Sequence, residues 1–285
     1  ADAERGRPVE TGPDGTSLTV REGHGGWTYH HTEVARPFLD PVRTPSGLPV
    51  SRDAPDDHPW HHGLWFTIKF VNGDNFWEEW EDFGLLRHRG APSVETDAEG
   101  GVRVAGTIDW IAPDETTVAV VETRTLTHVP LDGDAYAIDL DTTLVAPIDT
   151  TYDRTPFTTW GGYGGLSLRG PGDWADTRLL LGDGTDHQRV LGESAPWCDL
   201  SSDDRGVTLL DHPGNPRFPC PWYGSTRADT YGDEGWSNFL NAAFLWHEPL
   251  DVEAGEPLRI RHRAVVHDGR WDRALADAAH EAHGG

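Results

Sequence analysis

Three histidines follow a double aspartate in the segment DDHPWHH, and they are the residues of this chain best suited to chemistry. They are His58, His61 and His62, with Trp60 between them and Asp57 directly before the first. Imidazole groups titrate near neutral pH, and a neighbouring carboxylate can orient one of the rings. The spacing therefore predicts an acid–base site, in which His58 and His62 transfer protons and Asp57 orients a histidine.

Histidines at this spacing could instead bind a metal ion. The ligand set we expect for such a site is His58, His61, His62 and the more distant His212, which comes after an apolar run. A divalent metal ion is then the expected cofactor, whereas acid–base chemistry needs none. In a third interpretation the histidines only form hydrogen bonds at a turn that precedes a strand.

The local conformation of this segment is predicted by Pro59. Proline disfavours a helix that continues through His58, so we expect an extended or turn conformation leading into the apolar run after His62. In an extended chain successive side chains point to opposite sides. His58 and His62 would then share one side, and His61 would point to the other.

A second group of candidates is the acidic segment WEEWED. Glu78 lies next to Trp77, and it is the carboxylate that we expect to face inward. A carboxylate desolvated against an aromatic ring can act as a general acid. Glu79, Glu81 and Asp82 are expected to form a solvated acidic turn.

Aromatic residues recur beside arginine, aspartate and asparagine in several loop-rich segments. This combination is typical of sugar-binding surfaces, because the rings cover C–H faces and the polar groups hold hydroxyls. Ordinary core packing of the tryptophans and a structural ion pair of the arginine are the alternatives. The candidate substrate-binding residues are Arg52, Trp65, Trp77, Tyr163, Arg169, Asp211, Asn215 and Trp222.

Strands must position these side chains, because apolar and polar residues alternate with a period of two. The alternation is clearest at 102–110, 118–126, 136–143 and 258–267. The 33 glycines and 21 prolines mark turns between short strands and favour antiparallel sheets. One helix is expected over about 271–283, with Asp268 as its cap. We expect a single all-β domain over 1–285, with 1–15 as a flexible arm.

The composition excludes some partners. The 285 residues include 48 acidic and 23 basic residues, which give a formal net charge of −25 at pH 7. Such a charge argues against binding to nucleic-acid phosphates or to anionic membranes. No apolar run approaches the length that spans a bilayer, and two cysteines are too few for a disulfide scaffold. We expect a soluble, cytoplasmic protein that binds a small molecule; its oligomeric state is left open.

Several blocks of the sequence together resemble the PmoA-like (methane-oxygenase-A-like) family of unknown function. The resemblance extends from Arg36 to Gly269. It implies a relation to the galactose-mutarotase-like superfamily, and therefore an antiparallel β-supersandwich whose concave sheet carries the histidines and carboxylates. The matching blocks are RPFLDPVRTPSGLPVSRD, DDHPWHHGLWF, VNGDNFW, WGG at 160–162, WCDLS, LLDHPGNPRFPCPWY and VVHDG.

The residues and the resemblance together predict a carbohydrate-processing enzyme. It would act on a sugar, a glycoside or a glycosylated small molecule by histidine and carboxylate acid–base chemistry, as a lyase, hydrolase or isomerase, with metal assistance as an option. One alternative is an oxidoreductase whose histidines bind copper or iron. The other is a non-catalytic sugar-binding module, which would share the aromatic residues but would not need the histidines.

Overall fold

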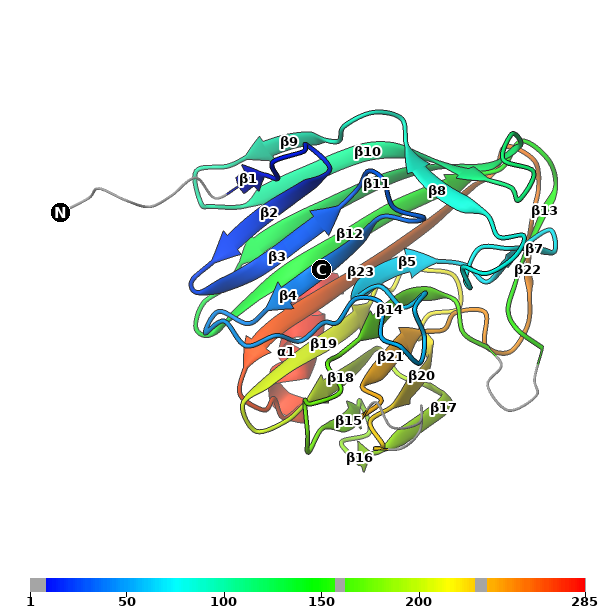
Figure 1. Ribbon diagram of the computed structural model, residues 1–285. Coiled ribbons are helices and arrows are strands. Elements are labelled where there is room, and N and C mark those ends of the chain that lie inside the picture. The colour runs from blue at the N-terminus through cyan, green and yellow to red at the C-terminus, as the bar shows by residue number, and fades with distance from the viewer. Residues whose placement is uncertain (1–8, 157–161, 229–234, 285) are drawn as a thin grey trace.

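The computed structural model describes residues 9–156, 162–228 and 235–284. Within them the chain forms two large antiparallel β-sheets stacked as a sandwich, with a small sheet at one end (Figure 1). The predicted all-β antiparallel sandwich with a short C-terminal helix is confirmed. Two features of the sequence, residues 1–8 of the expected arm and residues 160–161 of the WGG block, lie outside the described residues.

The first sheet carries three of the candidate site residues in its strands: Trp65, Arg169 and Trp222. Its strands are β1 (Val9–Thr11), β2 (Ser17–Glu22), β3 (Gly25–His30), β4 (Phe38–Arg43), β5 (Leu64–Thr67), β14 (Gly165–Arg169), β17 (Arg189–Ser194), β20 (Pro221–Ser225) and β21 (Phe239–Ala242). In the described part of the chain they are hydrogen-bonded in the order β1-β2-β3-β4-β5-β14-β21-β20-β17.

The second sheet contains the longest strands. They are β8 (Leu85–His88), β9 (Ser93–Thr96), β10 (Val102–Ile111), β11 (Val118–Pro130), β12 (Ala135–Val145), β15 (Arg178–Leu181), β16 (Asp186–His187), β18 (Trp197–Ser201), β19 (Arg205–Asp211) and β23 (Pro257–Asp268). Their order is β16-β15-β18-β19-β23-β12-β11-β10-β8, and β9 pairs with β10. The four predicted strands are confirmed as β10, β11, β12 and β23.

The small sheet lies at the end of the sandwich where β5 stops. Its strands are β6 (Phe70–Val71), β7 (Asp74–Asn75), β13 (Thr150–Asp153) and β22 (Leu250–Val252), in the order β22-β13-β6-β7. It holds the chain that runs from β5 toward the acidic segment, and so it sets the position of Glu78.

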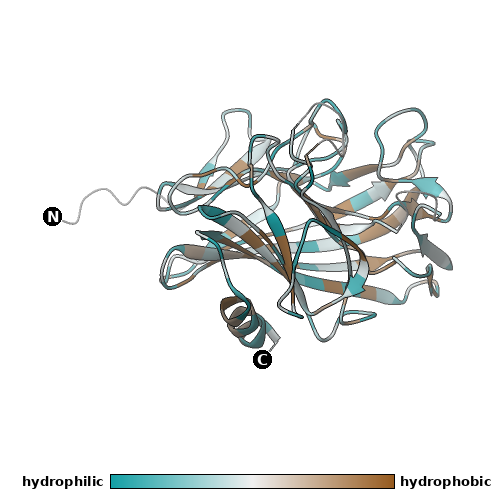
Figure 2. Cartoon of the chain, turned by 90° about the horizontal axis from the view of Figure 1, so that it is seen from below, coloured by the Kyte–Doolittle hydropathy of each residue, from teal (hydrophilic) through white to brown (hydrophobic). Residues whose placement is uncertain are grey.

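The hydrophobic core lies between the two large sheets, where the strands carry their apolar residues (Figure 2). Alternation decides which side chains enter it: Leu64 and Phe66 of β5 pack in the core, whereas Trp65 and Thr67 point to the outer face of the first sheet. Each fully buried Leu or Phe side chain stabilises the fold by roughly 1.5–3 kcal/mol. The core therefore provides a rigid base for the outer face.

Helix α1 (Arg273–Gly284) packs outside the second sheet, away from the first. Its buried Ala276 joins a separate apolar cluster with Trp197 and Leu210. The prediction of Asp268 as the cap is wrong, because β23 continues to that residue. Asp272 caps the helix instead, since its Oδ1 accepts a hydrogen bond from the Leu275 amide at 3.0 Å. No helix in the described residues is long and apolar enough to cross a membrane.

Candidate functional site

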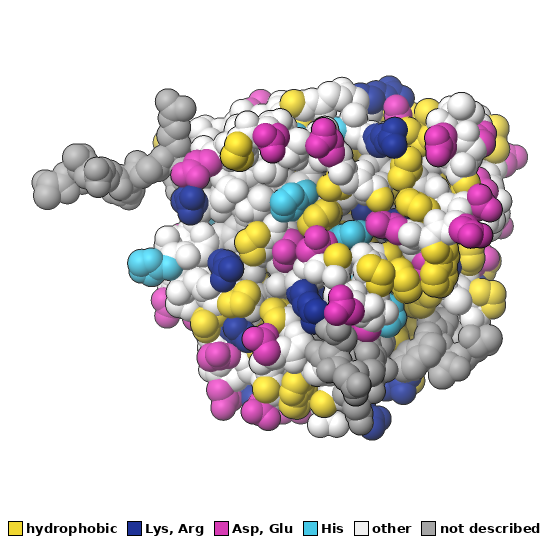
Figure 3. Space-filling view, viewed as in Figure 1, with side chains coloured by type: hydrophobic (Ala, Val, Ile, Leu, Met, Phe, Trp, Pro, Cys, Tyr) yellow, Lys and Arg dark blue, Asp and Glu magenta, His cyan; other side chains and the backbone are white. Residues whose placement is uncertain are grey.

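Aromatic side chains gather on the outer face of the first sheet, separate from the core. Strands β4, β5, β21 and β20 each contribute a ring to this face, because outward positions alternate with core positions. In the space-filling view, hydrophobic side chains gather right of the centre, and histidines lie among charged groups (Figure 3). We call this group the outer aromatic cluster; it consists of Phe38, Trp65, Trp77, Tyr223, Phe239, Ala243 and Trp246, with Val34, Trp60 and Tyr163 packed against them.

Asp57 and His58 form an oriented dyad beside this cluster. The buried guanidinium of Arg169 donates two hydrogen bonds to the Asp57 oxygens, at 2.8 and 2.9 Å. Asp57 Oδ2 is also 2.6 Å from His58 Nδ1. Burial alone would raise the pKa of Asp57, but the hydrogen bonds from His58 and Arg169 hold it at about 2. Asp57 is therefore ionised and orients His58, whose side chain stays 28% exposed.

His61 lies within the outer aromatic cluster as a neutral imidazole. Its ring stacks on His58 at 4.5 Å and on Phe239 at 5.0 Å between centroids. Burial, followed by repulsion from cationic neighbours such as Arg169, lowers the pKa of His61 well below its usual value. Its Nδ1 lies 3.4 Å from Arg169 Nη1, which fits an acceptor.

Of the two conformations expected for this segment, extended or turn, the structure shows the turn. The segment forms two successive turns, so the opposite directions that an extended chain would give His58 and His61 do not apply. The His58 amide donates to Pro55 O at 3.0 Å, and the His61 amide donates to His58 O at 2.9 Å. These turns bring both rings to the same side.

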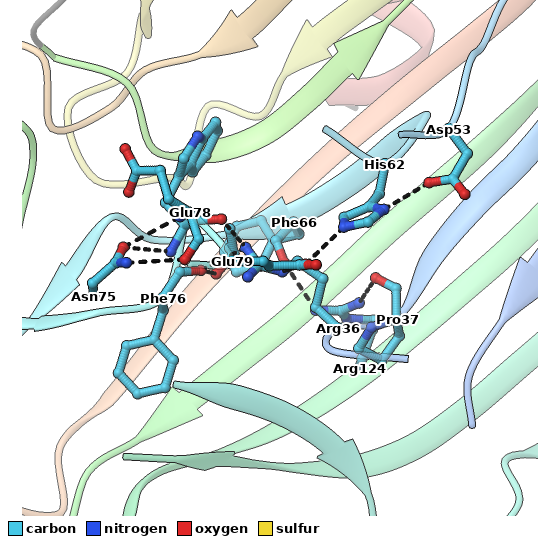
Figure 4. Close-up of polar contacts among 12 residues, drawn as sticks. Arg36, Pro37, Asp53, His62, Phe66, Asn75, Phe76, Glu78, Glu79 and Arg124 are labelled. Carbon is cyan, nitrogen blue, oxygen red and sulfur yellow. Dashed lines mark hydrogen bonds and ion pairs between the residues drawn. The ribbon is translucent and has the colours of Figure 1, made fainter. Parts of the chain in front are cut away.

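His62 connects two carboxylates (Figure 4). Its Nδ1 is 2.6 Å from Asp53 Oδ1 and its Nε2 is 2.7 Å from Glu79 Oε1. Burial alone would lower the pKa of His62, but the two hydrogen-bonded carboxylates raise it above its usual value. Both nitrogens carry protons when they face carboxylates, so His62 is an imidazolium.

Glu79 is not part of a solvated turn, and that expectation is wrong. Its carboxylate is 3.1 Å from Nε of Arg36, whose side chain is fully buried. Arg36 also donates to the carbonyl oxygens of Phe76 and Trp77, each at 2.7 Å. A buried cation therefore draws Glu79 toward the sheet, where it completes the chain Asp53–His62–Glu79–Arg36.

This charge on His62 predicts a pH-dependent contribution to stability. A pKa raised in the folded state gives stability that is fully present below the unfolded pKa of about 6.5 and is lost as pH rises through the folded pKa. We expect His62→Gln to lower the free energy of unfolding by about 1–3 kcal/mol at pH 6 and by less at pH 9. Urea unfolding at both pH values measures this. The exposed histidine variant His24→Gln is the control, and an equal loss at both pH values would contradict the prediction.

Glu78 faces inward, as expected, with 5% of its surface exposed. One of its oxygens pairs with the ammonium of Lys69, and the other accepts a hydrogen bond from Tyr163 at 3.3 Å. The Tyr163 ring lies 5.0 Å from Trp77, which places this trio at the edge of the outer aromatic cluster. Sequence reasoning did not select Lys69, although one signal could have: it is the only lysine in the chain.

A family model matches residues 18–281. The chain belongs to DUF6807, a family of unknown function. The comparisons give no support to the expected PmoA-like resemblance; the family that matches is DUF6807, which is also of unknown function. No curated protein matches this DUF6807 chain.

The chain is similar, at low sequence identity, to two solved structures. One is the GH36 α-galactosidase AgaB from Geobacillus stearothermophilus, with 10% identity and a TM-score of 0.40, over 92% of this chain and 41% of that one. The other is a galactose mutarotase related enzyme from Lactobacillus acidophilus, with 8% identity and a TM-score of 0.41, over 93% of this chain and 99% of that one. The DUF6807 chain thus spans about two fifths of the α-galactosidase.

Four of the eight predicted substrate-binding residues lie at or beside the outer aromatic cluster: Trp65, Trp77, Tyr163 and Arg169. Arg52 lies beside them, because its amide donates to Arg169 O at 2.8 Å. Trp222 does not: it packs between the sheets, and its Nε1 donates to a backbone carbonyl at 2.8 Å.

Asp211, Asn215 and His212 belong to the other side of the sandwich. Asn215 donates to Asp211 at 2.7 Å, and the Cys220 amide donates to the same carboxylate at 2.8 Å. Burial raises the pKa of Asp211 to about 6. The His212 ring contacts His283 of α1 at 5.3 Å. The structure therefore does not bring these three residues to the outer aromatic cluster.

The four predicted metal ligands do not converge. His58 and His61 stack face to face, both nitrogens of His62 face carboxylates, and His212 lies beside α1. In the described parts of the chain, no three His, Cys, Asp or Glu side chains are arranged to hold a metal ion. In this arrangement His58, His61, His62 and His212 share no point at which they could bind one metal ion.

Proposed function

We propose that the protein is a carbohydrate-processing enzyme in which the Asp57–His58 dyad transfers protons to and from a sugar bound at the outer aromatic cluster. The observation that carries the proposal is the position of His58. Asp57, itself held by Arg169, fixes the Nδ1 side of the ring at 2.6 Å, and the side chain stays 28% exposed. An imidazole oriented in this way can serve as a general acid or base near neutral pH.

The protonation states around the dyad suit this chemistry. Asp57 is ionised, His61 is neutral and His62 is charged, because burial and nearby charges shift their pKa values in different directions. Such separation of pKa values is how one site supplies both an acid and a base. Elimination, hydrolysis and epimerisation of a sugar all require this pair of roles.

Two tryptophans next to His58 supply a surface for the sugar ring. Trp80 is 58% exposed, so its ring face is open to a ligand. Its ring lies 4.8 Å from Trp60, and the ring of Trp60 lies 5.4 Å from His58. A sugar stacked on this pair would have its hydroxyls near the dyad.

The test is a screen of glycosides and keto-sugars for turnover, followed by Trp80→Ala on any substrate found. Loss of one stacking face is worth about 1–1.5 kcal/mol, so KM should rise about 10-fold while kcat changes little. Trp80→Phe is the matched control and should stay close to the wild-type KM. A sugar that binds without turnover would support the sugar-binding module instead. A protein that binds and converts no carbohydrate would contradict the proposal.

A further inference from the structure

Lys69 is a buried amine at the same site, and the dyad mechanism does not use it. The alternation of β5 continues past its end, so Lys69 points to the outer face with Trp65 and Thr67, whereas Ile68 enters the core. It is the only lysine among 23 lysines and arginines. Arginine stays protonated in proteins and cannot act as a nucleophile, whereas an amine can lose its proton. Lys69 is therefore the only side chain of this protein that can supply an amine nucleophile.

Lys69 is surrounded by one carboxylate, one amide and apolar groups. Its side chain is 8% exposed, and Nζ pairs with Glu78 and lies 3.3 Å from Asn75 Oδ1. Burial, and after it the positive charge of Arg36, lower the pKa of Lys69 to about 8. Glu78 is placed to take the ammonium proton, and Tyr163 donates to that carboxylate at 3.3 Å.

Phe70, whose ring the Lys69 amine overlies, also lines a surface pocket. Lys69 Nζ overlies the ring of Phe70 at 4.7 Å from its centroid. Phe70 also lines a pocket of about 430 Å³, together with Asn72, Gly73, Thr151 and Asp153. Glu78, the carboxylate paired with Lys69, also contacts the outer aromatic cluster: it accepts a hydrogen bond from Tyr163, whose ring lies against Trp77.

We infer that Lys69 is a nucleophile that forms a Schiff base with the carbonyl carbon of an open-chain aldehyde or keto-sugar. The inference rests on the proposed function, because it names a substrate class and a second catalytic residue for that site. Glu78 accepts the ammonium proton, and the free amine attacks the carbonyl carbon to form a C–N bond. The hydroxyl of the adduct then leaves as water with the proton from Glu78, so ammonium and carbonyl give a protonated imine and water.

The protonated imine accounts for elimination or epimerisation. It withdraws electrons and so acidifies the adjacent C–H bond, and the Glu78 carboxylate can remove that proton. Return of the proton, followed by attack of water on the imine carbon, releases the sugar and regenerates the Lys69 amine.

The single lysine makes the test direct. The whole protein is incubated with D-erythrulose, a keto-sugar too short to close a stable ring, and with sodium cyanoborohydride, which reduces an imine to a stable amine. Intact mass and peptide mapping then locate the adduct. We expect one adduct at Lys69, formed at least 10-fold faster than at the amino terminus and faster at pH 8 than at pH 6.

Two variants separate chemistry from structure. Lys69→Arg keeps the charge opposite Glu78 and should fold, yet give no adduct on that peptide and at least a 100-fold loss of sugar turnover. Glu78→Gln keeps the amine and should form the adduct at least 10-fold more slowly. The inference is overturned if labelling is no faster at Lys69 than at the amino terminus. It is also overturned, with the proposed function intact, if turnover requires His58 but survives Lys69→Arg.

Discussion

Replacement of His58 with glutamine is expected to lower kcat/KM for the sugar substrate by about 10²–10⁴-fold, the usual contribution of a positioned general acid or base. Glutamine is similar in length and can still donate a hydrogen bond to Asp57. It cannot gain and lose a proton near neutral pH. The measurement is steady-state kinetics on a substrate from the screen, with thermal unfolding of the same samples to show that the fold is retained.

Two further variants, Asp57→Asn and His24→Gln, test whether the loss of activity comes from the oriented dyad. Asp57→Asn keeps the shape of the dyad but removes its negative charge, so activity should fall because the ring loses the partner that orients it. His24→Gln removes an exposed histidine and should change nothing. Wild-type kcat/KM in the His58→Gln variant would exclude the dyad as the catalytic group.

The second large effect is expected for stability. Arg169→Met should lower the free energy of unfolding at pH 7 by about 3–5 kcal/mol, because it leaves the Asp57 carboxylate without its cation. The Asp57 side chain is only 7% exposed, and Arg169 is fully buried. Urea unfolding measures the loss. Arg259→Met is the matched control: its pair with Asp141 is largely exposed, so it should cost less than about 1 kcal/mol.

The same pair predicts how stability depends on acid. The folded pKa of Asp57 is about 2, below its ordinary value of 3.8. A depressed pKa contributes stability that is present above the unfolded pKa and is lost as pH falls through the folded one. About 2 kcal/mol should therefore disappear between pH 4 and pH 2 in the wild type, at about 1.4 kcal/mol per unit of pKa. Arg169→Met should show a smaller decrease over this interval. An equal decrease in both proteins would exclude the pair as its source.

The sequence by itself was sufficient for the fold class and for part of the site. A period of two over 102–110 and 258–267 has one structural solution, a strand with a buried face, and β10 and β23 follow it. The residue types of adjacent positions also predicted two local features, one hydrogen bond and one buried carboxylate. Asp57 orients its immediate neighbour His58, and Glu78 turns inward next to Trp77. These relations hold between residues adjacent in the chain, where geometry leaves few alternatives.

Only the tertiary structure decided which distant groups would meet. The Asp57–Arg169 pair joins residues 112 positions apart. The cation that draws in Glu79 is Arg36, which lies in the bend before β4. Alternation shows which residues share a face, but it does not show whether that face looks into the core. Trp222 therefore lies inside the sandwich while its neighbour Tyr223 lies outside, although both are aromatic. Strand order determines which face of a sheet is covered by the other sheet. Together with the loops over the outer face, it also determines which charges share a low-dielectric environment.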